Sequence, residues 1–193
     1  MSTNDSQFLT ALFRESAAAH ERFASTNVDR VAEAATAVSE ALKRGRQVLA
    51  FGNGGSATDA QHLIAELVGR FEGERRSLPG VALTSDSATV TAIANDYGYE
   101  RVFARQVEGL GREGDVAVGI STSGRSPNVQ AALVAAKSGG LTTIALTGRD
   151  GGPIGAIADI HVNVAETTTA RIQEVHRTIL HAMCSLIELQ LKA

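Results

Sequence analysis

From Gly45 onward the chain alternates short apolar runs with longer segments of helical spacing, and no other sequence feature constrains the fold as much. The apolar runs are bounded by Gly, Asp and Ser, a pattern that predicts strands. Five strands are expected, at Gln47–Phe51, Val81–Thr84, Val116–Ile120, Thr143–Thr147 and Ile160–Val164. Helices are expected between and after them, at Ala57–Val68, Thr89–Ala94, Phe103–Leu110, Pro127–Lys137 and Ala170–Leu191. Because strands that alternate with helices build βαβ units, we expect an α/β fold with a parallel sheet covered on both faces.

The N-terminal residues 1–45 show helical spacing without strands. Apolar residues recur every three or four positions from Phe8 to Phe13, and again from Val28 to Leu42. This pattern predicts an N-terminal helical hairpin (1–45) ahead of an α/β core (46–193). No linker, repeat or low-complexity segment interrupts the sequence, so we expect a single domain of residues 1–193.

The composition excludes several classes of protein. The 193 residues carry 18 Lys and Arg against 21 Asp and Glu, a formal net charge of −3, which excludes a strongly basic nucleic-acid binder. The single cysteine, Cys184, can form neither an internal disulfide nor a thiolate metal cluster. The sequence has no apolar run of about 18 residues, and its N-terminal segment lacks the apolar core of a signal peptide. We therefore expect a cytoplasmic protein without nucleic-acid or membrane partners.

Three predicted strands end in loops that are rich in glycine and hydroxyl groups, and ligands of open parallel sheets bind beyond such strand ends. The loops are Gly52–Ser56, Ser121–Ser126 and Thr147–Gly152. The second loop precedes Pro127, which suits the first position of a helix. A helix N-terminus with several nearby hydroxyl groups is typical of an anion site. A hydroxyl-rich helix cap without a ligand is the alternative, and the Walker lysine of nucleotide hydrolases is absent.

The first loop formally matches the dinucleotide fingerprint, through Gly52, Gly54 and Ala57. That fingerprint expects an acidic residue about 20 positions further on, at the end of the second strand. The nearest candidate, Asp86, lies too far downstream. A second, hydroxyl-rich phosphate loop also has no role in a dinucleotide site, so a nicotinamide or flavin enzyme is a weak alternative.

Two predicted helices carry side chains with the chemistry of a catalytic or metal site. His62 and Glu66 are four residues apart and share a helix face, so they could hold a divalent cation or act as an acid–base pair. A simple surface contact is the alternative for this pair. On the last helix, Gln173, Arg177 and His181 follow one ridge. His181 is near the apolar face, where an idle imidazole is costly, and a buried, hydrogen-bonded histidine is the alternative there.

The spacing of Gln173 and His181 poses a geometric problem for a shared ion. Eight residues correspond to about 12 Å along a helix and about 80° around it. Either Gln173 precedes the regular helix and reaches back, or the site combines residues of neighbouring subunits. The second option would make the protein an obligate oligomer.

In these loops and helices the sequence resembles the phosphoheptose isomerases of the sugar isomerase (SIS) domain superfamily. The matching segments are Gly52–Ser56, His62 with Glu66, Asn95–Gly98, Gly111–Asp115, Ile120–Gly124, Leu146–Gly148 with Gly151–Gly152, and Arg171–Glu174 with His181. The resemblance implies a single SIS domain with a flavodoxin-like five-stranded parallel sheet and an N-terminal helical extension. It also implies a homotetramer with active sites at the subunit interfaces.

The resemblance further implies a role for each matching residue. The substrate would be bound by Asn53, Gly54, Gly55, Ser56, Glu66, Asn95, Asp96, Ser121, Thr122, Ser123, Ser126 and Gln173, with the serine-loop hydroxyl groups on the phosphate. One zinc ion per subunit would be held by His62, Glu66, Gln173 and His181. Glu66 would be the catalytic base and His181 the acid/base in converting sedoheptulose 7-phosphate into D-glycero-D-manno-heptose 7-phosphate through an enediol. The product would be a heptose precursor for lipopolysaccharide or another glycan.

A non-enzymatic SIS adaptor that binds the bacterial replication initiator is the alternative function. Such adaptors are expected to lack the catalytic carboxylate and the final histidine, whereas Glu66 and His181 are both present here. Other SIS activities, such as amino-sugar phosphate isomerases or muramic-acid phosphate lyases, are expected to lack the whole metal-binding set. One departure from the family is the stretch Thr167–Ala170, where some members carry an acidic residue, and this leaves the substrate range open.

The remaining polar residues are interpreted as structural. We expect a solvated mixed-charge loop from Glu72 to Arg76, a surface position on a strand for His161, and a small core residue at Cys184.

Overall fold

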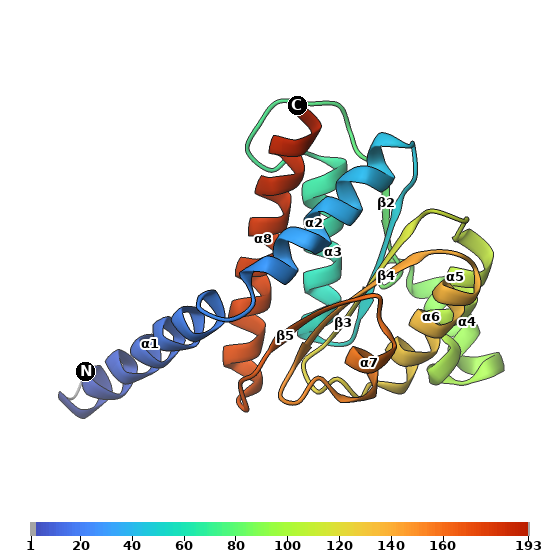
Figure 1. The fold of residues 1–193 in the computed structure, drawn as a ribbon. Helices are drawn as coiled ribbons and strands as arrows, with labels where there is room; N and C mark the ends of the chain where they lie inside the picture. The colour runs from blue at the N-terminus through green and yellow to red at the C-terminus, as the bar shows by residue number, and fades with distance from the viewer. Residues whose placement is uncertain (1–2, 193) are drawn as a thin grey trace.

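The centre of the computed structural model, which describes residues 3–192, is a five-stranded parallel sheet (Figure 1). The strands are β1 Val48–Gly52, β2 Gly80–Ala82, β3 Val116–Ser121, β4 Thr142–Gly148 and β5 Ile160–Val164. Their order across the sheet is β2-β1-β3-β4-β5. This is the order of flavodoxin-like folds, so the predicted fold class is confirmed. The second strand is shorter than predicted and ends at Ala82.

Helices connect the strands and cover both faces of the sheet. They are α1 Thr3–Ala24, α2 Val28–Lys43, α3 Gly55–Val68, α4 Ser87–Tyr97, α5 Ala104–Leu110, α6 Pro127–Ser138, α7 Gly152–Ile157 and α8 Thr169–Lys192, with a 3-10 turn, η1, at Tyr99–Arg101. Every helix predicted from the sequence is present. The sequence pattern does not predict α7 and η1, because each is shorter than two helical turns and shows too few apolar repeats.

Alternate residues of the central strands build two apolar cores, one on each face. Val48 and Ala50 of β1 pack on the side of α2, α3 and α8. Leu49 and Phe51 of the same strand pack on the side of α5, α6 and α7. This follows from the period of two along a strand. β1 and β3 are buried at every position, as expected for a parallel sheet with both faces covered. The ends of these two central strands are therefore the parts that a ligand can reach.

The two N-terminal helices do not form the predicted hairpin. In Figure 1, α1 and α2 follow one another nearly in line, and each packs on α8. The short junction between the two helices is a turn, in which the N–H groups of Thr26 and Asn27 both donate to the carbonyl of Phe23, and the chain continues in nearly the same direction. The α1 helix projects from the body of the molecule and leaves Phe8 and Phe13 exposed, at 64% and 77%.

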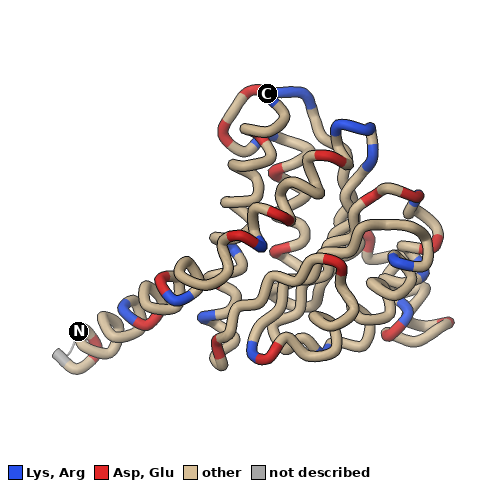
Figure 2. The backbone as a smooth tube through the Cα atoms, in the orientation of Figure 1, with Lys and Arg blue, Asp and Glu red and all other residues tan. Residues whose placement is uncertain are grey.

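Charged residues of both signs are interspersed over the molecule (Figure 2). This distribution agrees with the nearly balanced composition. Among residues 3–192, no helix combines the length and the apolar character that crossing a membrane requires.

Candidate active site

The candidate site lies where the strand order reverses direction. β1 is followed along the chain by β2 on one side, whereas β3, on its other side, continues to β4 and β5. Ligands of open α/β sheets bind at such a switch point, outside the carboxyl ends of the two strands. The ends of β1 and β3 carry the loops Gly52–Ser56 and Ser121–Ser126.

The serine loop after β3 has the geometry of an anion site. The hydroxyl oxygen of Ser121 lies 2.9 Å from that of Ser126 and 3.4 Å from that of Ser123. Pro127 opens α6, and Ser126 stands at its N-cap position, yet the Ser126 side chain makes no capping hydrogen bond. The hydroxyl group of Ser126 therefore faces the loop rather than the helix. In the alternative interpretation, a helix cap without a ligand, this hydroxyl would bond to the N–H groups of the helix. The free N–H groups at the start of α6 add partial positive charge.

Gly124 is required in this loop by its backbone. Its φ is +65°, and a Cβ atom there would collide with the backbone of Gly151 and Gly152. The second and third glycine-rich loops predicted from the sequence are therefore in direct contact. Thr122, between the serines, is half-buried.

A pair of asparagines joins the first loop to the serine loop. The Asn53 and Asn128 amides exchange two hydrogen bonds of 2.9 Å, and the Tyr99 hydroxyl donates to Asn53 Oδ1 at 3.2 Å. Sequence analysis missed Asn128 and Tyr99. Asn128 follows Pro127 in the first turn of α6, and that position was the available signal.

The other residues of the first loop differ in exposure. Gly54 and Gly55 are exposed, whereas the Ser56 side chain is buried at the start of α3. Gly54 has a φ of +56°, which favours glycine. A Cβ atom on Gly55 would collide with the Gln173 amide, so Gln173 lies directly against this loop.

Asn95 and Asp96 lie on the exposed helix α4 and bond to one another, with Asn95 Nδ2 donating to Asp96 Oδ1 at 2.8 Å. The hydrogen bonds of Asp86 show that it caps this helix, because its carboxylate accepts the N–H groups of Ala88 and Thr89. The hydrogen bond from the Thr89 hydroxyl, followed by these backbone bonds, lowers the pKa of Asp86. Its capping role argues against a dinucleotide site.

Two imidazoles and a carboxylate meet between α3 and α8. His62 Nε2 lies 2.8 Å from His181 Nε2 and 3.4 Å from Glu66 Oε1, and all three side chains are half-buried. The Phe71 ring packs on His181, with ring centroids 5.4 Å apart. Burial, followed by the positive charge of Arg177, lowers the pKa of His62, against the effect of Glu66.

The α3 and α8 helices run side by side, and three contacts follow one another along them. Gln173 lies against Gly55, Arg177 forms a 2.7 Å ion pair with Asp59, and His181 meets His62. Sequence analysis missed Asp59, which is 3% exposed and lies on the helix face that carries His62.

Within one chain, Gln173 does not join the two histidines. It lies inside α8, which starts at Thr169, so the option that it precedes the helix is wrong. The Asp59–Arg177 pair separates it from His181.

The side chains of this cluster have the donor chemistry that suits zinc. His62, Glu66 and His181 offer nitrogen and oxygen ligands of the kinds that zinc binds. Within the part of the chain that the structure describes, however, no group of three or more His, Cys, Asp or Glu side chains is arranged to hold a metal ion.

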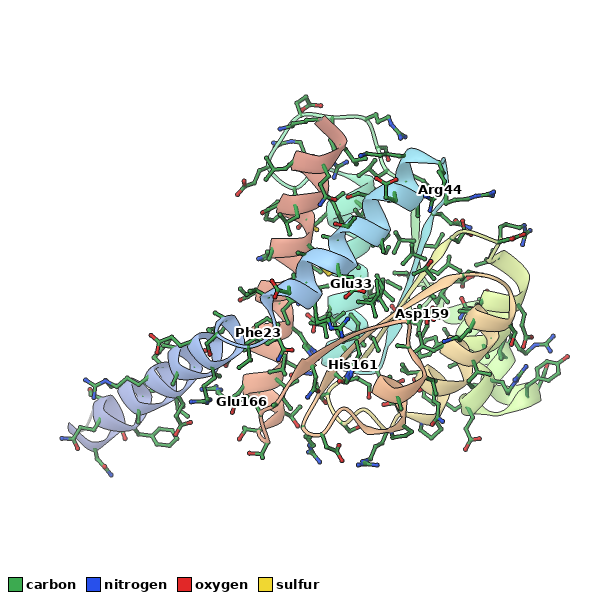
Figure 3. All side chains as sticks on the ribbon, viewed as in Figure 1. Phe23, Glu33, Arg44, Asp159, His161 and Glu166 are labelled. Carbon is green, nitrogen blue, oxygen red and sulfur yellow. The ribbon has the colours of Figure 1, made fainter. Side chains whose placement is uncertain are left out.

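Of three structural interpretations from the sequence, that of His161 is wrong, that of the Glu72–Arg76 loop holds in part, and that of Cys184 is confirmed. His161, labelled in Figure 3, is a half-buried residue whose Nε2 lies 2.6 Å from the Thr147 hydroxyl. Its ring fills the space that a Cβ atom on Gly151 or Gly155 would need. In the mixed-charge loop, Glu72, Glu74 and Arg76 are exposed as predicted. Arg75 is the exception, since its side chain is only 10% exposed and forms an ion pair with Glu188. Cys184 is a core residue, and burial raises the pKa of its thiol to about 12.

Comparison with known proteins gives the class first. A family model described as "SIS domain" matches residues 11–148, so the chain belongs to the SIS domain family.

The more similar relatives then give the particular group. The phosphoheptose isomerase of Nitratidesulfovibrio vulgaris is 49% identical over 188 residues, 97% of this chain and 90% of the relative. That of Geobacter sulfurreducens is 56% identical over 162 residues, 84% of this chain and 86% of the relative. The solved structure of phosphoheptose isomerase from Neisseria gonorrhoeae has a TM-score of 0.91 at 46% identity, with 95% of this chain and 98% of that chain covered. Within its family, the chain is thus grouped with the phosphoheptose isomerases, aldose–ketose isomerases that act on a sugar phosphate in heptose synthesis.

Proposed function

We propose that this chain interconverts sedoheptulose 7-phosphate and D-glycero-D-manno-heptose 7-phosphate, as a step toward lipopolysaccharide or another heptose-containing glycan. The observation that carries the proposal is the pairing of a serine loop at a helix N-terminus with an imidazole–carboxylate cluster. An isomerase of phosphorylated sugars needs these two parts, an anchor for the phosphate and an acid–base pair for the proton transfers.

In this proposal the two loops hold the two ends of the substrate. Ser121, Thr122, Ser123 and Ser126 bind the phosphate through their hydroxyl groups. The sugar chain is bound by Asn53, Gly54, Gly55, Ser56, Asn95, Asp96 and Gln173. Binding energy from the remote phosphate positions the reacting carbons and thereby lowers the barrier.

Glu66 and His181 carry out the proton transfers. The Glu66 carboxylate takes the proton from C1, and the electron pair of that C–H bond forms the C1–C2 double bond of the enediol while the ketone oxygen accepts a proton from His181. Glu66 then returns its proton to C2, and His181 recovers a proton from the hydroxyl group on C1 as the aldehyde forms. Protons and electrons balance, and both side chains end as they began.

We also propose one zinc ion per subunit and a homotetramer with active sites at its interfaces. His62, Glu66 and His181 would supply three ligands, and Gln173 of a neighbouring subunit would supply the fourth. Within one chain, Gln173 packs on Gly55, and the Asp59–Arg177 ion pair lies between it and His181. Bound zinc would polarise the oxygens of the substrate.

Incubation of the purified protein with sedoheptulose 7-phosphate tests the proposed reaction. The expected product is the aldose 7-phosphate. In deuterated water, deuterium should enter at C2 of the product, to the extent that the proton held by Glu66 exchanges with solvent during the reaction. Fructose 6-phosphate is the matched control, since it offers the same keto group and a phosphate on a shorter chain. Turnover of the control sugar at an equal or greater rate would contradict the assigned substrate.

A further inference from the structure

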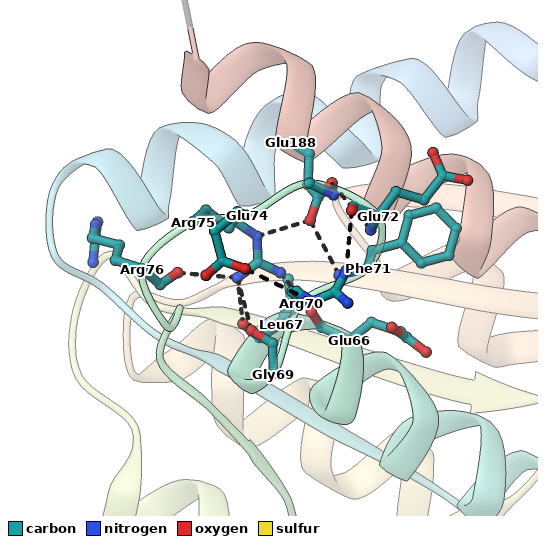
Figure 4. Close-up of polar contacts among 11 residues, drawn as sticks. Glu66, Leu67, Gly69, Arg70, Phe71, Glu72, Glu74, Arg75, Arg76 and Glu188 are labelled. Carbon is teal, nitrogen blue, oxygen red and sulfur yellow. Dashed lines mark hydrogen bonds and ion pairs between the residues drawn. The ribbon is translucent and has the colours of Figure 1, made fainter.

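Glu188 is a buried carboxylate that the proposed chemistry does not use. It lies on α8, is 5% exposed, and accepts N–H groups from Phe71 at 3.1 Å, Glu72 at 3.3 Å and Gly73 at 2.7 Å (Figure 4). The Arg75 guanidinium adds a fourth donor at 3.0 Å. Burial alone would raise the pKa of Glu188, but these backbone bonds and the charge of Arg75 hold it below its usual range. One carboxylate therefore fixes the loop that follows α3.

Arg75 in turn fixes the end of α3. It donates to the carbonyl oxygens of Glu66 at 2.5 Å, Leu67 at 2.9 Å and Gly69 at 3.4 Å (Figure 4). These carbonyls belong to the last turn and the C-cap of the helix, where backbone acceptors have no intrahelical partner and a cation is favourable. The first of them belongs to the proposed catalytic base itself.

The same loop places an aromatic ring on the proposed acid/base. Glu188 holds the Phe71 N–H, and the Phe71 ring lies 5.4 Å from the His181 ring at an angle of 33°. His181 precedes Glu188 on α8 by seven residues, about two turns, so both lie on one face of the helix. The contacts of Glu188 and Arg75 thus reach both groups that the proposed reaction needs.

We propose that Arg75 and Glu188 are positioning residues that set the placement of Glu66 relative to His181. The inference rests on the proposed function of those two groups. The ion pair ties the C-terminal turn of α3, which carries Glu66, to the helix that carries His181. A buried ion pair adds little net stability, because the loss of hydration offsets the attraction. Its main consequence is therefore geometric, and small misplacements of reacting groups lower rates strongly.

The test compares Glu188→Gln and Arg75→Met with a control that removes a similar carboxylate elsewhere. Asp115 is 2% exposed and accepts the N–H groups of Gln47 and Arg112 at the opposite end of the sheet, so Asp115→Asn gives comparable structural damage. We expect kcat for sedoheptulose 7-phosphate to fall about tenfold or more in both Glu188→Gln and Arg75→Met, with KM within about twofold of wild type. Asp115→Asn should leave kcat near wild type. Equal kcat values in Glu188→Gln, Arg75→Met and Asp115→Asn would overturn the proposal.

A second measurement does not need turnover. The NMR signal of the His181 imidazole should shift in Glu188→Gln and Arg75→Met, because the Phe71 ring moves, and should stay in place in Asp115→Asn. If the wild-type protein fails to isomerise the heptulose, the proposed function is wrong. The NMR signal then still tests whether Arg75 and Glu188 position the residues around His181. If Glu188→Gln and Arg75→Met do not fold, Phe71→Leu is the variant to measure, because it keeps the ion pair and removes only the aromatic ring. An unchanged kcat and His181 environment in that variant would overturn the proposal.

Discussion

Single residues of the candidate site come from distant parts of the chain and meet in one half-buried cluster. His62 and Glu66 occupy one turn of α3, and His181 reaches them from α8. Burial lowers the pKa of His62, which favours the neutral form of this imidazole. The arrangement places an imidazole beside the carboxylate that is proposed to take the C1 proton.

Glu66→Gln tests the carboxylate. We expect the variant to fold normally, because the amide has nearly the same shape, and to lose about 10³-fold or more in kcat, because an amide cannot accept the C1 proton. Initial rates with sedoheptulose 7-phosphate and thermal unfolding of both proteins are the measurements. Glu33→Gln, on the surface of α2, is the control. A Glu66→Gln protein with a rate near wild type would refute the assignment.

His176 makes a residue-scale prediction about stability. It is completely buried, its Nε2 lies 2.9 Å from the Thr147 carbonyl, and burial lowers its pKa from 6.5 to about 4. The unfolded chain therefore binds a proton that the folded chain excludes between these values. The stabilising contribution is complete above pH 6.5 and is lost as the pH falls toward 4, by about 3 kcal/mol in total.

Unfolding by urea at several pH values measures this contribution. Between pH 7.5 and 4.5, the free energy of unfolding should fall further in wild type than in His176→Gln, which keeps a donor for the Thr147 carbonyl but does not titrate there. Parallel pH curves for the two proteins would show that His176 is protonated equally in the folded and unfolded states.

At the scale of elements, the site depends on two contacts between loops and helices. The serine loop and the start of α6 form the proposed anion-binding unit, which is joined to the first loop through Asn128. The α3 and α8 helices lie side by side and bring the proposed acid–base groups together. The first unit should govern substrate binding, and the second should govern the chemical step.

Ser123→Ala tests this division. Loss of one hydrogen bond to a charged phosphate should raise KM about tenfold while kcat changes less. Steady-state kinetics provide both values, and Ser138→Ala at the far end of α6 is the matched control. If Ser123→Ala altered kcat alone, the loop would belong to the reacting end of the substrate instead.

At the scale of the whole molecule, α1 projects away from the sheet with two large aromatic side chains exposed. An exposed apolar helix face of this kind is typical of an interface. In the proposed homotetramer this helix would pack against neighbouring subunits, and Gln173 would complete a site across the boundary.

Replacing both Phe8 and Phe13 by Asp tests the assembly. We expect light scattering to show a loss of the four-chain mass, and activity to fall with it, because incomplete sites remain. Val134→Asp makes the same kind of change on α6, at a residue that is 51% exposed, and should leave the mass unchanged. A doubly substituted protein with wild-type mass would exclude α1 from the interface.

The sequence by itself determined the elements and the loops at the strand ends, because these depend on local periodicity and turn chemistry. The five strands, the major helices and the serine loop before Pro127 follow from residues close together in the chain. The resemblance carried by His62, Glu66 and His181 pointed to the correct enzyme family.

Only the tertiary structure decided which distant side chains meet. The amphipathic pattern of α8 predicts a buried face, but not that Gln173 lies on Gly55 or that Glu188 holds the loop with Arg75. It also gives no sign that His161 fills the space beneath two glycines, nor that α1 and α2 continue in line. Helix spacing fixes the relation of residues within one element, whereas the register between two elements is set by how their surfaces pack.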